Sequence, residues 1–213
     1  MKVGTRINEE IKKDIVDQLY WDSRVDASNV NVEVSDGEVT LSGTVPNYTA
    51  YDAADEDAWT MLGVLFVNNK LTIQYPDSTA LPPDDELEVN IKNILLWQPN
   101  IDSAELDVSV ENGWVTLRGT VDTYWKKVKA GELTLGLSGV LGITNEIAVV
   151  PSESYTDKAI ADDIESAMER NFNLDQSMID VAVENGRITL TGSVRSLVDY
   201  KASQKIAENT LCV

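Results

Sequence analysis

Histidine is absent from this chain of 213 residues, and cysteine occurs once, as Cys212. Without histidine the chain cannot form a Ser-His-Asp or Cys-His nucleophile system, and it lacks the side chain that most often acts as a general base. A single cysteine excludes a disulfide within the chain and a metal site built from several thiolates. An enzyme is therefore the least expected class of protein, and we predict no catalytic residue, no cofactor and no metal site.

Positive charge is also scarce, because 17 basic residues stand against 36 acidic ones and give a net charge of −19. This field repels phosphate backbones, so we expect no nucleic-acid partner. No stretch approaches the roughly 18 consecutive apolar residues of a transmembrane segment. The opening residues, MKVGTRINEEIKKDIV, lack the apolar segment of a secretory signal. As written this predicts a cytoplasmic chain, or a periplasmic one if a signal has been removed.

The acidic residues are spread over all three parts of the chain, and one cluster, DAADEDA at 52–58, falls within an expected helix. Its spacing does not match an EF-hand loop. We interpret the cluster as a solvated helix face, with a loose cation site as the alternative.

The sequence contains one cassette in three copies: DGEVTLSGTV at 36–45, NGWVTLRGTV at 112–121 and NGRITLTGSV at 185–194. The copies are 76 and 73 residues apart, and at these offsets the surrounding sequence aligns almost without gaps. Self-similarity at a fixed period is the signature of a repeat architecture. The chain is therefore predicted to consist of three related units.

Each unit begins with a helix and continues into a hairpin. Asn8, Asp84 and Asp157 precede the helices and are good N-cap residues. Apolar residues then recur every four positions on one helical face: Ile11, Ile15 and Leu19; Leu87, Ile91 and Leu95; Ile160, Ile164 and Met168. Alternating β-branched residues follow, and the SDG or ENG turn after them predicts a return strand.

The second half of each unit has its own signals. Glycine interrupts the return strand at Gly43, Gly119 and Gly192, which indicates a bulge or a close approach of the backbone to a helix. The N-cap residues of a second helix are Asn47, Thr123 and Ser196. A last strand is expected at 68–73 and at 144–149. The order of elements is therefore α-β-β-α-β, which makes the fold class α+β.

The predicted domains are 1–76, 77–151 and 152–213, and the third lacks its final strand. Cys212 occupies the position that Gly63 and Gly139 occupy in the other two units. Two explanations stay open. The reading frame is truncated, or the missing strand leaves an open sheet edge that another chain fills, which would allow self-association.

The chain resembles the BON family, the bacterial osmotically inducible and nodulation module. The resemblance rests on VEVSDGEVTLSGTV with GVLFVNNKL, on VSVENGWVTLRGTV with GVLGITNEI, and on VAVENGRITLTGSV. It implies a tandem array of small modules, each with two helices packed on a three-stranded mixed sheet. The family implies periplasmic stress and envelope proteins that attach to phospholipid membranes or to other surface ligands. It implies no catalysis and transfers no active-site residue to this chain.

One stretch differs from the acidic background: TYWKKVKAG at 123–131, which opens the second helix of the second unit. Our candidate binding residues are Tyr124, Trp125, Lys126, Lys127 and Lys129. Aromatic rings beside lysines are the chemistry of a phospholipid headgroup boundary. The alternative is a helix start in which an aromatic ring packs on the sheet and the lysines are solvated.

Trp21 and Trp97 end the first helix in the first two units, and we expect them to pack in a core or between neighbouring units. Two functions stay open. The first is a non-enzymatic envelope or osmotic-stress protein that touches phospholipid headgroups or envelope proteins. The second is a soluble scaffold that binds proteins, small ligands or cations without lipid contact.

Overall fold

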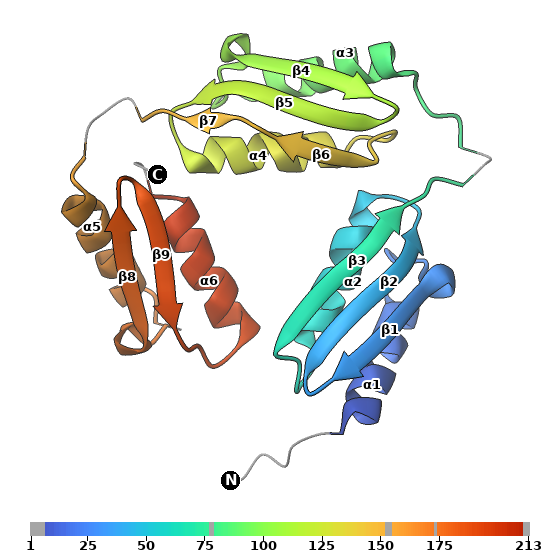
Figure 1. The fold of residues 1–213 in the computed structure, drawn as a ribbon, viewed down its shortest axis with the longest axis horizontal. Helices are drawn as coiled ribbons and strands as arrows, with labels where there is room; N and C mark the ends of the chain where they lie inside the picture. The colour runs from blue at the N-terminus through green and yellow to red at the C-terminus, as the bar shows by residue number, and fades with distance from the viewer. Residues whose placement is uncertain (1–6, 77–78, 152–154, 173, 211–213) are drawn as a thin grey trace. The chain divides into compact units, whose positions relative to one another are not determined.

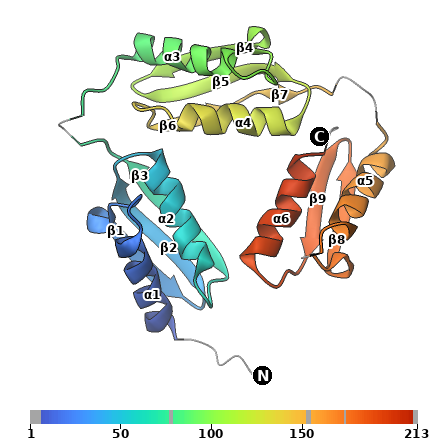
Figure 2. The ribbon, with the colours of Figure 1, turned by 180° about the vertical axis from the view of Figure 1, so that it is seen from behind.

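The computed structural model describes residues 7–76, 79–151, 155–172 and 174–210. Three similar groups of elements follow one another along the chain (Figure 1), and in each group the helices lie on one face of a sheet, as the reverse view shows (Figure 2). We call them repeats 1, 2 and 3. The α+β fold expected from the sequence is confirmed.

Repeat 1 contains the complete unit. Its helices are α1 (Asn8–Trp21) and α2 (Tyr48–Thr60), and its strands are β1 (Val30–Ser35), β2 (Glu38–Val45) and β3 (Phe66–Ile73), with a 3₁₀ turn at Ala27–Asn29. Strand β2 is central, antiparallel to β1 and parallel to β3. The core lies between this sheet and the two helices, where α1 contributes Ile11, Ile15 and Leu19. The four-residue spacing thus predicted the buried face of α1 correctly.

Repeat 2 has the same plan. Its helices are α3 (Asp84–Leu96) and α4 (Tyr124–Leu135), and its strands are β4 (Leu106–Glu111), β5 (Trp114–Val121), β6 (Gly142–Asn145) and β7 (Ala148–Val149), with a 3₁₀ turn at Ser103–Glu105. Strands β6 and β7 both lie beside β5 and replace the single last strand expected at 144–149. Glu146 lies between β6 and β7, and its N–H donates to Leu117 O of β5 at 2.8 Å, so the pairing with β5 continues from β6 to β7.

Repeat 3 has two strands among its described residues. It comprises α5 (Asp157–Glu169), a 3₁₀ turn at Gln176–Met178, the antiparallel strands β8 (Ile179–Glu184) and β9 (Arg187–Gly192), and α6 (Leu197–Glu208). Its fully buried hydrophobic residues are Ile160, Ile164 and Met168, and the apolar side chains of β8 and β9 are half-buried. Cys212 lies outside the described residues.

The hairpin turns have a partner that local sequence did not reveal. Asn8, Asp84 and Asp157 were expected to cap helices, but each is instead the first residue of its helix. The Asp84 carboxylate accepts hydrogen bonds from Asn112 N at 2.6 Å and Gly113 N at 2.9 Å. Asp157 accepts from the hairpin turn of repeat 3 in the same way, and Asn8 accepts one bond from that of repeat 1. These side chains therefore hold the turn against the start of the helix.

The strand glycines are explained by a close backbone approach. At Gly43, Gly119 and Gly192, φ is 111°, 122° and 145°, in the region that disfavours side chains. A Cβ added at Gly119 would lie 2.0 Å from Glu105 O, in the 3₁₀ turn before the first strand, and the other two glycines meet the equivalent carbonyl. The predicted close approach of the backbone is present, and its partner is the last residue of the 3₁₀ turn and not an α-helix.

An asparagine fastens the last strand to the second helix in repeats 1 and 2. Asn145 Nδ2 donates to Lys127 O at 2.9 Å, and its Oδ1 accepts from Ile147 N at 3.3 Å. Asn69 makes the equivalent bonds with Tyr51 O and Leu71 N, at 3.4 and 3.1 Å. One side chain therefore satisfies backbone groups on both elements.

Candidate functional site

The five candidate residues of α4 are all partly exposed but point in different directions around the helix. Successive helical residues are rotated by about 100°, so Trp125 and Lys129 share one face with Glu132. Lys127 belongs to the opposite face, with the buried Ala130 and Thr134. The structure brings together Trp125 and Lys129 and does not gather all five residues into one surface.

Two of the three lysines already have acidic partners. Lys126 Nζ lies 2.7 Å from one oxygen of Asp122 and 2.8 Å from the other, and Lys129 Nζ lies 3.0 Å from Glu132. Lys127 forms no ion pair within the described residues. Partly exposed pairs of this kind are weak, so an anionic surface can compete for the lysines. They nevertheless lower the net positive charge that the stretch offers.

Trp125 and Lys126 line a shallow hollow in repeat 2. The other lining residues that belong to repeat 2 are Pro99, Asn100, Ile101, Asp102, Asp122 and Thr123. These residues follow the end of α3 or surround the start of α4, which lie at the same end of the repeat (Figure 1). We call this end of repeat 2, with Leu96, Trp97, Trp125 and Lys126, the aromatic end.

The tryptophans at the ends of the first helices are exposed. Trp97 is 81% exposed and Trp21 is 79% exposed. The prediction that they pack in a core is wrong. Trp21 is the last residue of α1 and Trp97 directly follows α3, and other side chains already form the buried face of each helix. Packing between repeats stays a prediction. Leu96 and Tyr20, the neighbouring residues, are also exposed, at 66% and 77%.

The same end of repeat 3 exposes a different aromatic residue. Phe172, just after α5, is 94% exposed, and Arg170 stands where the other repeats have tryptophan. An exposed single aromatic side chain is unremarkable, but a large one at the same end of every repeat indicates a contact surface. Alignment of the repeats places Trp21, Trp97 and Arg170 at one position, and Phe172 lies two residues after it.

The acidic stretch 52–58 is not uniformly solvated, contrary to our interpretation. Asp57 is 4% exposed, and its Oδ1 accepts from Gln18 Nε2 at 3.0 Å, while no described group bonds its Oδ2. Burial raises the pKa of Asp57 and favours its neutral form. The charged neighbours are Asp22, whose pKa is lowered chiefly by hydrogen bonds from Arg24, and Arg24 itself.

Neither a metal cluster nor a membrane span is found where the structure describes the chain. No three acidic or cysteine side chains come together there in a way that could hold a metal ion. None of the described helices has the length and apolar character needed to cross a bilayer.

Comparison with known proteins identifies the repeats. The model of the BON domain matches three ranges, 8–75, 83–151 and 156–213. The chain belongs to the BON domain family. It is also similar to the outer membrane lipoprotein DolP of Haemophilus influenzae, with 30% identity over 140 residues, which cover 64% of this chain and 72% of that protein.

Two solved structures of CdsD, a structural protein of the type III secretion system of Chlamydia trachomatis, also align with this BON protein. The first is 14% identical with a TM-score of 0.27 and covers 96% of this chain and 88% of that chain. The second, of the C-terminal domain, is 13% identical with a TM-score of 0.25 and covers 93% and 91%.

Proposed function

We propose that this protein is a non-enzymatic, envelope-related binding protein that associates weakly with phospholipid surfaces through the aromatic end of repeat 2. The observation that carries the proposal is the exposure of Trp97, at 81%, next to the hollow lined by Trp125 and Lys126. Amphipathic rings favour the headgroup region, and a lysine near an anionic surface contributes about 1 kcal/mol. The relative DolP is named an outer membrane lipoprotein, which supports an envelope setting.

The net charge of −19 opposes strong binding to anionic lipid, because every repeat has more acidic than basic residues. It favours the second candidate, a soluble scaffold that binds proteins or small ligands without touching lipid. Weak contacts made by three tethered repeats would be strengthened by effective concentration in either case. The two functions therefore differ in whether vesicles bind the chain at all.

The test is co-sedimentation of the 213-residue chain with neutral and with anionic vesicles, at low and at moderate salt. Replacing Trp97 by alanine should reduce the bound fraction, as should the triple change of Lys126, Lys127 and Lys129 to glutamate. The matched control is Trp114→Ala, because Trp114 is 52% exposed but lies at the opposite, hairpin end of the repeat. This control should bind like the unchanged chain.

Salt should weaken binding to anionic vesicles, because it screens the attraction between the lysines and the anionic lipid headgroups. Equal binding by the Trp97→Ala and Trp114→Ala chains would remove the aromatic end from the proposal. No sedimentation at any salt, with either vesicle, would leave the scaffold as the function to pursue.

A further inference from the structure

Repeat 1 has an exposed apolar loop between α2 and β3, residues 61–66. In it Leu62 is 67% exposed, Leu65 74% and Phe66 52%. The surrounding stretch AWTMLGVLFV, at 58–67, contains no charged residue. The loop lies at the hairpin end of repeat 1, where β1 turns into β2 (Figure 1), because Phe66 pairs with the start of β2. Single exposed apolar side chains are ordinary, but three in one short loop indicate a contact surface.

The rest of repeat 1 fixes the shape of this loop. Met61 and Val64 are partly buried and pack against the core, as does Trp59 near the end of α2. The rings of Trp59 and Phe66 meet edge to face, with their centroids 6.2 Å apart. The loop therefore presents its other large side chains to the outside in one fixed arrangement.

The backbone of the loop has hydrogen-bond partners inside the repeat. Leu65 N and Phe66 N both donate to Gly37 O, at 2.8 and 3.4 Å. Val64 N donates to Met61 O at 3.2 Å. The core of a bilayer offers no hydrogen bond, so a chain segment enters it at low cost only when its backbone groups have partners of their own. The loop can therefore enter an apolar phase without leaving these amides unpaired.

The shared fold does not require large apolar side chains in this loop. In repeat 2, Ser138 stands in place of Leu62 and Gly142 in place of Phe66. The ring of Trp114 covers Gly142 there. Repeat 2 forms the same helices and the same central hairpin with these residues, so folding alone does not account for Leu62 and Phe66.

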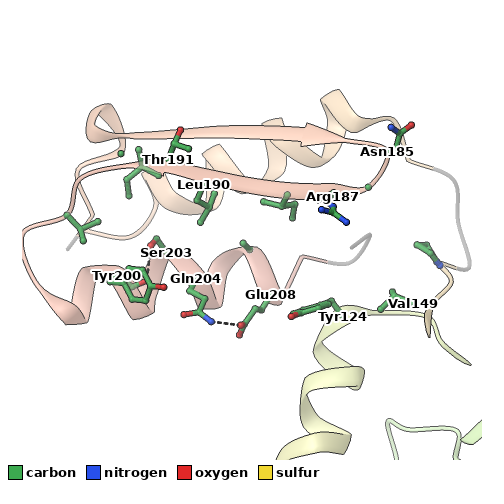
Figure 3. Close-up of a pocket in the computed structure, with 17 residues that line it drawn as sticks. Tyr124, Val149, Asn185, Arg187, Leu190, Thr191, Tyr200, Ser203, Gln204 and Glu208 are labelled. Carbon is green, nitrogen blue, oxygen red and sulfur yellow. Dashed lines mark hydrogen bonds between the residues drawn. The ribbon is translucent and has the colours of Figure 1, made fainter. Parts of the chain in front are cut away.

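Two negative charges lie beside the loop. Asp36 and Glu38 are exposed, and Glu38 pairs with Phe66 in the sheet. Repeat 3 has Asn185 and Arg187 at these positions, on its hairpin (Figure 3). The two acidic residues of repeat 1 repel anionic lipid, and they repel a second copy of this chain, whose net charge is −19. An electrically neutral surface is therefore the one that the loop approaches most easily.

The chemistry of the loop favours lipid over protein as that neutral surface. A typical protein interface has about ten hydrogen bonds. The side chains of residues 62–66 have no donor or acceptor, and the amides of Val64, Leu65 and Phe66 already have partners. Hydrocarbon needs no hydrogen bond and takes up leucine and phenylalanine side chains favourably. Tryptophan prefers the boundary between headgroups and acyl chains, which suits Trp59 at the base of the loop.

We propose that the loop 61–66 inserts into the boundary between headgroups and acyl chains of a zwitterionic phospholipid bilayer, with Leu62, Leu65 and Phe66 as the inserted side chains. The insertion rests on the proposed function, since the chain must reach a phospholipid surface, but it adds a second contact in another repeat. The two contacts respond differently to salt. Attraction through the lysines of repeat 2 is screened, whereas apolar insertion is not.

The test uses the full 213-residue chain and phosphatidylcholine vesicles at high salt, where screening suppresses the lysine contact. Co-sedimentation measures the partition of the unchanged chain and of two variants. Leu62→Ser places the residue of repeat 2 in the loop, and the matched control Val16→Ser removes a side chain that is 44% exposed on α1. We expect Leu62→Ser to reduce the partition about fivefold and Val16→Ser to reduce it less than about twofold, because only Leu62 loses contact with hydrocarbon.

A nitroxide label reports insertion directly. It is attached to Leu62→Cys, or to Val16→Cys as the control, in chains that also carry Cys212→Ser. When vesicles are added, the label at position 62 should become more accessible to oxygen, which is enriched in hydrocarbon, and less accessible to a water-soluble nickel complex. The label at position 16 should keep its accessibility to both reagents.

The outcomes separate this loop from the aromatic end of repeat 2. Chains that sediment while the label at position 62 stays in water would overturn the insertion and leave the proposed lipid contact intact. Sedimentation that Leu62→Ser reduces and Trp97→Ala does not would support the loop and remove the aromatic end. A label at position 62 that is shielded before vesicles are added would also overturn the insertion, because a protein surface would then cover the loop. No sedimentation with any vesicle would refute both contacts.

Discussion

Replacing Asp84 by alanine should unfold repeat 2 more readily although Asp84 is a surface residue of a helix. The substitution removes the carboxylate that accepts from Asn112 N at 2.6 Å and Gly113 N at 2.9 Å. The turn they belong to is strained for an ordinary residue, because φ is +51° at Asn112 and +76° at Gly113. The hydrogen bonds therefore hold together a turn that is 28 residues away along the chain.

The magnitude follows from the number and kind of bonds. Hydrogen bonds to a charged group contribute about 1.5–3 kcal/mol each when well shielded. The bond to Asn112 is exposed and that to Gly113 partly buried, so we assign about 1 kcal/mol to each. The loss of about 2 kcal/mol corresponds to about a thirtyfold change in the opening equilibrium of the repeat.

Native-state hydrogen exchange measures this change for each repeat separately, because slow amides of β4 and β5 exchange only when repeat 2 opens. They should exchange about thirtyfold faster in the Asp84→Ala chain. The conservative Asp84→Asn change keeps one acceptor oxygen, as Asn8 does naturally in repeat 1, and should lose about half the free energy.

The matched control is Glu86→Ala, which removes one negative charge from the same first turn of α3. If Asp84 acted only through the helix dipole, the two alanine variants would weaken the repeat equally, by a few tenths of a kcal/mol. Equal exchange rates in both variants would refute the hydrogen-bond argument.

Three further changes test other parts of the fold. Asp57→Asn should raise the free energy of unfolding by about 1 kcal/mol at neutral pH. Because burial raises the pKa of Asp57, the stability that its neutral form contributes is fully present below the ordinary pKa of 3.8 and is lost as the pH rises through the folded pKa. Denaturation at several pH values should therefore show a difference in stability between the two chains that disappears in acid. Gly119→Ala should cost at least about 3 kcal/mol in urea denaturation, since the new Cβ meets a backbone carbonyl. Asn69→Ala should cost about 1–2 kcal/mol, while Asn68→Ala, on the exposed side of the same strand, should cost almost nothing in the same denaturation experiment.

The elements that the sequence predicted well are those whose signals are local and periodic. The spacing of Ile11, Ile15 and Leu19 fixes one helical face, and alternation in β1 fixes one face of a strand. The turn Asp36-Gly37 specifies a two-residue hairpin because both residues take positive φ. Each of these signals acts over a few residues, so three aligned copies were enough to find them.

The contacts that the sequence did not predict join residues far apart along the chain. An acidic residue before a helix looks like an N-cap, yet Asp84 bonds a turn on the hairpin. Asp57 stands in an acidic cluster that looks solvated, yet α1 covers it through Gln18. Trp97 follows the last turn of α3, where the periodic pattern of apolar residues has ended, so the sequence did not predict whether its side chain is buried or exposed. Tertiary partners decide these cases, and single-sequence patterns do not report them.

The positions where the repeats agree and those where they differ separate fold from function. Turn residues keep their chemistry in every copy because the turns need positive φ, and strand glycines do so because a Cβ would meet a backbone carbonyl. The tryptophan position keeps an exposed ring in repeats 1 and 2 but becomes Arg170 in repeat 3, and Arg187 replaces Trp114 at the start of the return strand. The ring of Trp114 covers Gly142, whereas Trp21 and Trp97 lie largely outside the cores of their repeats. Differences between copies on an otherwise constant scaffold are where repeat-specific binding is expected, and the aromatic end of repeat 2 is one such place.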